Sequence, residues 1–207
     1  SYKILHQGAG DLKNPDVPFL DKAFKNVTHY DTAGTFTKAE TKLGKQNFDV
    51  VISPYVLNTI PYSIRKQAII DAATSLKPNG SAYFAVRASD VDKAAAKSLS
   101  SKSPWTEYQD GWITARGTFQ KGYTGDELIA DLQTIPLFKE YNIIKDTSGM
   151  VIVEARVASK APKITKKMES AASAQMELLK VNSKISRLSQ QEKQLQKEAT
   201  ILYTDKL

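Results

Sequence analysis

The sequence has no cysteine and only two histidines, His6 and His29. Disulfides, thiolate metal sites and cysteine nucleophiles are therefore excluded, and two histidines are too few for a histidine-rich centre, so we expect no bound metal. No stretch reaches the roughly 18 consecutive apolar residues that a membrane-spanning helix needs. The first residues also lack the charged and then apolar segments of a secretory signal. These absences predict a cytoplasmic protein with no membrane partner.

Net charge is scarce over most of the chain. The formal net charge is +7, and residues 159–207 hold ten basic and five acidic residues, a surplus of five. The preceding 158 residues therefore carry only +2, by subtraction of five from seven. A nearly neutral globular part is not a general nucleic-acid-binding surface, whereas a basic tail suits either an anionic partner such as nucleic acid or plain solvent exposure.

Glycine and proline are absent from Lys163 to Leu207. Within this segment large apolar residues recur with heptad spacing, and the main ones are Leu178, Val181, Ile185, Leu188 and Leu195. Such a seam predicts one long helix that forms a coiled coil or docks on a partner, so we expect a homo-oligomer or a protein assembly through residues 163–202. A helix folded back on its own globular part is the alternative. The predicted organisation is a domain over residues 1–158, a linker over 159–162 and a helix over 163–207.

Two apolar runs in the middle of the chain predict parallel strands that are covered on both faces. Residues 48–52, apart from Asp49, and residues 82–86 are apolar without alternation. Residues 62–76 supply a crossover helix, with apolar side chains at helical spacing at Ile64, Ala68, Ile69, Ala72 and Leu76. A Pro-Asn-Gly turn at 78–80 separates this helix from the second strand, which completes a βαβ unit.

A glycine-containing turn follows the first predicted strand, residues 2–6. Gly8 and Gly10 allow a tight turn and close approach of a ligand to the backbone. A second strand over residues 26–30 ends at Asp31, 21 residues beyond Gly10, and this spacing is close to the about 20 expected between a glycine turn and an acid that binds ribose hydroxyls. The pattern predicts a nucleotide-type cofactor at this edge.

The remainder of the domain predicts two helices and a final hairpin. Residues 89–103 have a helical Lys/Ala/Ser composition, and Thr124 with Glu127 forms a capping box for a helix that extends to about Ile135. A strand over 141–144 and its antiparallel partner over 150–157 flank a turn at 147–149.

The segments 48–60, 76–80 and 6–12 together resemble class I S-adenosylmethionine-dependent methyltransferases. The first two read FDVVISPYVLNTI and LKPNG, and the third reads HQGAGDL where the family has approximately Asp-x-Gly-x-Gly-x-Gly. The resemblance implies an α/β, Rossmann-like sheet with an antiparallel final hairpin, and S-adenosylmethionine as cofactor. It places the cofactor on Gly8, Ala9, Gly10, Asp31, Ser53, Pro54 and Tyr55. His6 and Leu12 depart from the motif.

Ser53-Pro54-Tyr55 also resembles the Pro-Pro-Tyr motif of amino-directed DNA methyltransferases, in which an aromatic ring stacks on the target base. We expect weak substrate contacts from the polar side chains near the same edge, namely Asn58, Arg87, Arg116, Gln120 and Lys121. Trp112, Phe119 and Tyr123 are either stacking surfaces or a plug for the sheet edge. The segment 117–125 resembles small methyltransferase-like proteins, many of them from phages.

Two function classes remain open. The first is a methyltransferase whose acceptor the sequence leaves unspecified. The second is an inactive methyltransferase fold that serves as a structural or assembly protein, in a phage virion if the chain is phage-encoded, and that oligomerises or docks through its C-terminal helix. No Ser-His-Asp set, phosphate-binding Gly-Lys-Ser/Thr loop or carboxylate pair for hydrolysis is present.

Overall fold

The computed structural model describes residues 2–32, 35–37 and 43–159. The chain divides into two units, Ser1–Pro162 and Lys163–Leu207, and the described residues belong to the first. The predicted C-terminal helix, its seam and nearly all of the predicted linker lie outside the described residues, so they stay predictions.

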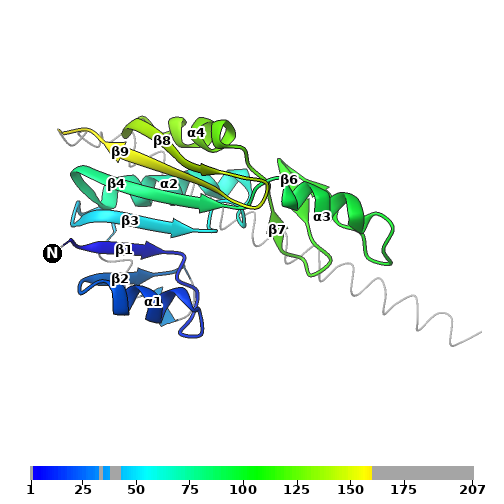
Figure 1. Cartoon of the computed structure of the whole chain (residues 1–207), viewed down its shortest axis with the longest axis horizontal. Coiled ribbons are helices and arrows are strands. Elements are labelled where there is room, and N and C mark those ends of the chain that lie inside the picture. Colours follow the sequence, from blue (N-terminus) through cyan, green and yellow to red (C-terminus); the bar gives the residue numbers. More distant parts are fainter. Residues whose placement is uncertain (1, 33–34, 38–42, 160–207) are drawn as a thin grey trace, which may run out of the picture. The chain divides into compact units, whose positions relative to one another are not determined.

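Six strands of the first unit form one sheet, and three short strands form another (Figure 1). In chain order the elements are β1 (Ile4–Gln7), α1 (Asp16–Ala23), β2 (Val27–Tyr30), β3 (Phe48–Pro54), α2 (Tyr62–Ser75), β4 (Leu76–Val86), α3 (Asp90–Ser98), β5 (Thr106–Tyr108), β6 (Gly111–Ile113), β7 (Phe119–Gln120), α4 (Gly125–Gln133), β8 (Phe138–Asp146) and β9 (Val151–Val157).

The large sheet has the strand order β2-β1-β3-β4-β9-β8. The pairs β2/β1, β1/β3 and β3/β4 are parallel, whereas β9 is antiparallel to both β4 and β8. Five strands therefore run in one direction and β9 alone is reversed. The predicted Rossmann-like sheet, with an interior β3 and an antiparallel final hairpin, is confirmed. The strand order reverses between β1 and β3, and ligands of open α/β sheets bind outside the carboxyl ends of the strands at such a point.

One face of the sheet holds the main core. Leu5, Val51, Ala82 and Ala155 lie in register across four neighbouring strands, and all four are 0% exposed. Helix α2 packs against β3 and β4 on this face, and α4 packs against β8 and β9. The edge-to-face contact of Phe84 with Phe138 joins the two halves of this core.

The opposite face is covered over only part of its width. His6, Ile52, Tyr83 and Glu154 form the neighbouring row in register, with His6 fully buried and the other three partly exposed. Helix α1 lies beside β2, whereas no described helix lies in front of β3, β4 and β9 (Figure 1).

Helix α2 differs from its predicted orientation by about one position. Ile64 is 38% exposed, while Arg65, which the predicted apolar stripe omits, is 1% exposed together with buried Ile69. Arg65 points inward because two carboxylates and two backbone oxygens accept hydrogen bonds from its guanidinium there. The chain then enters β4 directly at Leu76, so the predicted Pro-Asn-Gly turn is part of a strand irregularity, with Asn79 at a φ of 63°.

Other boundaries also shift. The helix predicted over 89–103 is the shorter α3, and the hairpin strand predicted over 141–144 is the longer β8. Residues 106–120, for which no strand was predicted, contain the three strands of the sheet β5-β6-β7. The capping box of α4 is confirmed, with Thr124 and Glu127 bonding reciprocally.

Within the described residues, no strand lies between Tyr30 and Phe48, no helix is long and apolar enough to cross a membrane, and no group of three or more His, Asp or Glu side chains could hold a metal.

Candidate functional site

The glycine turn after β1 is tied to the end of β2 by backbone hydrogen bonds. Gly8 and Gly10 have φ angles of 78° and 67°, in the left-handed region that glycine adopts without strain. The N–H groups of Gly8 and Ala9 donate to Tyr30 O at 2.9 and 3.0 Å. The Gly10 N–H donates to Asp31 Oδ2 at 2.8 Å. The turn and the acid that were predicted from their spacing therefore meet at the carboxyl edge of the sheet.

Gly8 also touches the loop that follows β3. A Cβ atom on Gly8 would lie 2.2 Å from Val56 Cγ2, a distance that real side chains do not reach. Only glycine therefore fits where the β1 turn and the post-β3 loop meet, which is the point where the strand order reverses. This contact brings the two predicted halves of the cofactor site against each other.

The carboxyl end of β3 places the next predicted residues. Ser53 is 0% exposed, and its Oγ has no hydrogen-bond partner among the described residues. Tyr55 adopts a φ of 56°, unusual for an aromatic residue, while its N–H donates to Ala85 O at 2.7 Å and its side chain stays 41% exposed. A buried hydroxyl without a hydrogen-bond partner, as in Ser53, and a strained backbone two residues away, as in Tyr55, are typical of ligand sites.

Three of the predicted substrate residues come together. The Asn58 Nδ2 amide donates to Gln120 Oε1 at 3.4 Å, and the Lys121 N–H donates to Asn58 O at 2.9 Å. Asn58 is 1% exposed, and its Oδ1 has no partner within the described part of the chain. The loop after β3 and the end of strand β7 therefore form a joint polar wall, made of Asn58, Gln120 and Lys121.

The other two predicted substrate residues are not part of this wall. Arg87 forms an ion pair with Asp90 through two of its nitrogens, and Arg116 is exposed in the turn between β6 and β7. Lys121 Nζ lies 3.6 Å from Asp110 Oδ2 and 4.6 Å from the centre of the Tyr123 ring. Two of the three predicted basic substrate residues, Arg87 and Lys121, therefore each lie beside a carboxylate.

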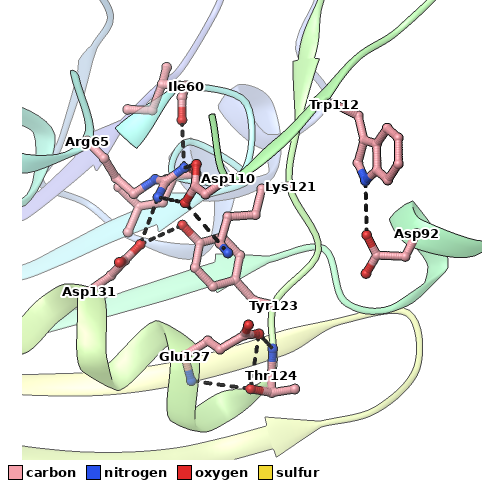
Figure 2. Close-up of polar contacts among 11 residues, drawn as sticks. Ile60, Arg65, Asp92, Asp110, Trp112, Lys121, Tyr123, Thr124, Glu127 and Asp131 are labelled. Carbon is pink, nitrogen blue, oxygen red and sulfur yellow. Dashed lines mark hydrogen bonds and ion pairs between the residues drawn. The ribbon is translucent and has the colours of Figure 1, made fainter. Parts of the chain in front are cut away.

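Of the three aromatic residues near the edge, two take the predicted role of a plug. Phe119 and Tyr123 are 5% and 2% exposed, so both are plugs that fill space beneath the small sheet. Trp112 is partly exposed and its indole N–H donates to Asp92 Oδ1 at 3.1 Å, which attaches β6 to α3 (Figure 2).

His6 occupies the motif position that holds an acid in the resemblance. Its Nδ1 lies 2.9 Å from His29 Nδ1, and His29 Nε2 lies 3.0 Å from Asp21 Oδ1. A carboxylate only accepts, so His29 carries its proton on Nε2, and a neutral His29 then accepts from His6 Nδ1–H. Burial first and the neighbouring His29 second lower the pKa of His6 to about 4. His6 is therefore neutral at physiological pH and serves the packing of β1 against β2.

Arg65 is the centre of a buried network that sequence reasoning missed (Figure 2). Its guanidinium donates to Asp110 at 2.6 and 3.1 Å and to Asp131 at 3.0 Å. It also donates to the backbone oxygens of Leu57 and Ile60, each at 3.1 Å. One side chain from α2 thereby holds the loop after β3, the turn before β6, and helix α4.

Electrostatics within the network favour the ionised forms of Arg65 and Asp110. Burial alone would raise the pKa of Asp110, but the hydrogen bonds and charge of Arg65 hold it below its usual value, with help from Lys121. Burial raises the pKa of Tyr123 well above its usual value, with the charge of Arg65 opposing, and its hydroxyl donates to Asp131 Oδ2 at 2.8 Å. Arg65 lies four positions before buried Ile69, so both residues lie on the same face of α2. This spacing was the signal in the sequence that could have revealed that Arg65 points inward.

A hollow of about 490 Å³ lies at the opposite, amino-terminal edge of the strands. It is lined by Lys3, Lys25, Asn26, Val27, Thr28, Asn47 and Phe48. None of these residues touches the glycine turn, and ligands of open α/β sheets bind at the carboxyl edge. We therefore place the candidate site at the carboxyl edge.

Comparison with known proteins supports the fold. No protein-family model matches the sequence, and no curated protein matches it. A SAM-dependent methyltransferase from Methanosarcina mazei superposes with a TM-score of 0.54 at 15% identity, over 77% of this chain and 94% of that chain. DhpI in complex with SAH gives 0.52 at 13% identity, over 76% and 78% of the two chains. A putative Zn-dependent alcohol dehydrogenase from Rhodobacter sphaeroides gives 0.51 at 13% identity, over 76% and 84%.

The described unit therefore has a class I methyltransferase-like, Rossmann-like fold. At these identities the likeness concerns the fold, and the role of each site residue stays a prediction.

Proposed function

We propose that the chain binds S-adenosylmethionine at the carboxyl edge of β1, β2 and β3 and transfers its methyl group to an acceptor. The observation that carries this proposal is the hydrogen bond from the Gly10 N–H to Asp31, which joins the glycine turn to the acid at the end of β2. The methyltransferase-like fold and the reversal of strand order between β1 and β3 support a ligand site at the same point.

The residues present suit this cofactor. Gly8, Ala9 and Gly10 offer a backbone turn that a ligand can approach closely, and the Asp31 carboxylate can accept hydrogen bonds from ribose hydroxyls. The orphaned Ser53 hydroxyl lies at the end of β3, where we place the methionine end. When bound, S-adenosylmethionine supplies a methyl group on a positively charged sulfur. A nucleophile attacks the methyl carbon, and the sulfur leaves.

The polar wall of Asn58, Gln120 and Lys121 is the candidate acceptor side. Asn58 Oδ1 is buried without a partner among the described residues, so it can accept a hydrogen bond from an N–H or O–H group of the acceptor. Holding the acceptor in line with the methyl carbon contributes most of the rate enhancement in such a reaction, and no side-chain base is required for an amine acceptor.

Calorimetry with S-adenosylmethionine and S-adenosylhomocysteine tests the cofactor. We expect micromolar binding by the full chain and a loss of at least about tenfold in Asp31→Asn, because a neutral amide accepts fewer strong hydrogen bonds from two hydroxyls. Asp126→Asn is the matched control, since Asp126 is exposed on α4 and its change should leave binding unaltered. Absence of heat at millimolar ligand would reject the enzyme and leave the inactive fold.

The structural role is the second candidate. We propose that the heptad seam of residues 163–202 forms a coiled coil and that the protein self-associates through it. Phage origin and a place in a virion stay predictions from the resemblance alone. A chain that binds no cofactor and yet assembles would fit this class.

A further inference from the structure

The sheet has an apolar surface that no described helix covers. Ile52, Tyr83 and Ala85, with Val50 and Ile152 beside them, all lie on the face opposite α2 and are all partly exposed. The residues that precede Ile52, Tyr83 and Ala85 in the chain point to the other face of the sheet. These residues, Val51, Ala82 and Phe84, are 0% exposed. Figure 1 shows β3, β4 and β9 with no described helix in front of them. Half of one face of this sheet therefore resembles the inside of a domain.

Parallel strands are ordinarily covered on both faces by helices, because their side chains are apolar on both sides. On this face α1 covers the β1/β2 part, where Ile4 and His6 are 2% and 0% exposed. Strand β3 thus has Val51 on the side that α2 covers, and Val50 and Ile52 on the side that no described helix covers. The sequence of β3 is that of a doubly covered strand.

A polar border limits the apolar surface on one side. Glu154 accepts hydrogen bonds from Ser81 Oγ at 2.8 Å, Tyr83 Oη at 3.2 Å and Arg156 Nη2 at 3.1 Å. These bonds hold the Glu154 pKa below its usual value, most strongly through Ser81. An apolar centre with an ordered polar rim is the composition of a protein–protein contact surface.

We propose that this face, formed by β3, β4 and β9, binds a second copy of the chain through the 163–202 segment of that copy. The seam of Leu178, Val181, Ile185, Leu188 and Leu195 has the apolar stripe that a sheet face requires. The segment also carries the surplus of basic residues, which suits a border where two carboxylates, Glu140 and Glu154, share the single cation Arg156.

The length of the segment favours a second copy over a fold-back. A helix of about 40 residues is roughly 60 Å long at 1.5 Å per residue, whereas a seven-residue strand such as β3 spans about 23 Å. A helix laid on a single sheet face would leave more than half of its seam in water. In a pair of copies, one part of each seam covers the partner's sheet face and the remainder packs helix against helix. This inference does not depend on cofactor binding.

Ultracentrifugation of the full chain tests the surface. We expect a dimer whose dissociation constant rises at least about tenfold in Ile52→Asp, since burying an unpaired carboxylate costs more than the 1.4 kcal/mol that corresponds to tenfold. Ile64→Asp is the matched control, because Ile64 is 38% exposed on α2 at the opposite face. Its dissociation constant should stay within about twofold of the parent.

Cross-linking identifies the occupant even if Ile52→Asp fails to fold. The natural chain has no cysteine, so Tyr83→Cys chains mixed with Leu188→Cys chains can form only one mixed bis-maleimide product. We expect that product, and none when Ile64→Cys replaces Tyr83→Cys. A monomer at all concentrations, a folded Ile52→Asp variant that dimerises like the parent, or no mixed product from Tyr83→Cys and Leu188→Cys would each overturn the proposal.

Discussion

Because His6 is buried, we expect the free energy of unfolding to fall on acidification. The size of this fall follows from the pKa of His6. The folded value is about 4, against an ordinary value of 6.5. Between these values the unfolded chain binds a proton at His6 and the folded chain does not, so the free energy of unfolding falls as the pH falls. The contribution of neutral, buried His6 to the free energy of unfolding is fully present above about pH 6.5, and it is lost progressively as the pH falls toward 4.

The magnitude follows from the linkage relation. A shift of about 2.5 pKa units corresponds to about 3 kcal/mol in full, and the part lost between pH 7 and pH 4.5 is about 2 kcal/mol. His6→Asn removes the titration and keeps an N–H that can donate to His29. Urea unfolding at both pH values should therefore show a fall in stability that is about 2 kcal/mol smaller in the variant than in the parent.

Proton NMR gives a direct check, because His6 and His29 are the only histidines in the chain. The resonance that disappears in His6→Asn belongs to His6, and in the parent it should not titrate above about pH 5. A His6 resonance that titrates near pH 6.5, or equal acid sensitivity of the two proteins in urea, would refute the reasoning.

Three further substitutions test packing and hydrogen bonds by urea unfolding. Arg65→Met should cost about 2–3 kcal/mol because it removes the hydrogen-bond donor of two partly exposed carboxylates and of two backbone oxygens, whereas Arg156→Met, at a site with 46% side-chain exposure, should cost clearly less. Equal costs would contradict the proposed network. Gly8→Ala should destabilise by clearly more than Gly117→Ala, since both residues have positive φ but only Gly8 has a neighbour, at 2.2 Å from the added Cβ. Thr124→Ala should cost about 1 kcal/mol through loss of the α4 cap, and an unchanged midpoint would show that the cap is dispensable.

The sequence predicted those features that depend on local pattern and chain spacing. The apolar runs placed β3 and β4 in a parallel sheet, and the interval from Gly10 to Asp31 brought both to one edge, where they bond at 2.8 Å. The capping box of α4 needed only Thr124 and the residue three positions on. Each of these inferences uses periodicity or a short interval, which tertiary packing seldom overrides.

Features that depend on distant pairings were not predicted. Arg65 reaches Asp110 across 45 positions and Asp131 across 66, and no local rule selects these two acids among the 22 acidic residues. The prediction placed Ile64 inward because it treated every charged residue as exposed. A buried arginine reverses that rule wherever carboxylates and carbonyls surround it. The short strands β5, β6 and β7 were missed for a related reason, since two or three residues carry no readable periodicity.

The candidate site therefore has two sides, and different hydrogen bonds hold each side in place. The glycine turn and Asp31 are held by backbone bonds between β1 and β2, whereas the wall of Asn58 and β7 is held by Arg65. The contact of Val56 with Gly8 links the two sides, and it is apolar. Loss of Arg65 should consequently loosen the loop after β3 and the small sheet while leaving the Gly10–Asp31 bond formed. Under the proposed function, a change on one side should therefore alter cofactor affinity without altering acceptor positioning, and the reverse, because each side depends on its own set of hydrogen bonds.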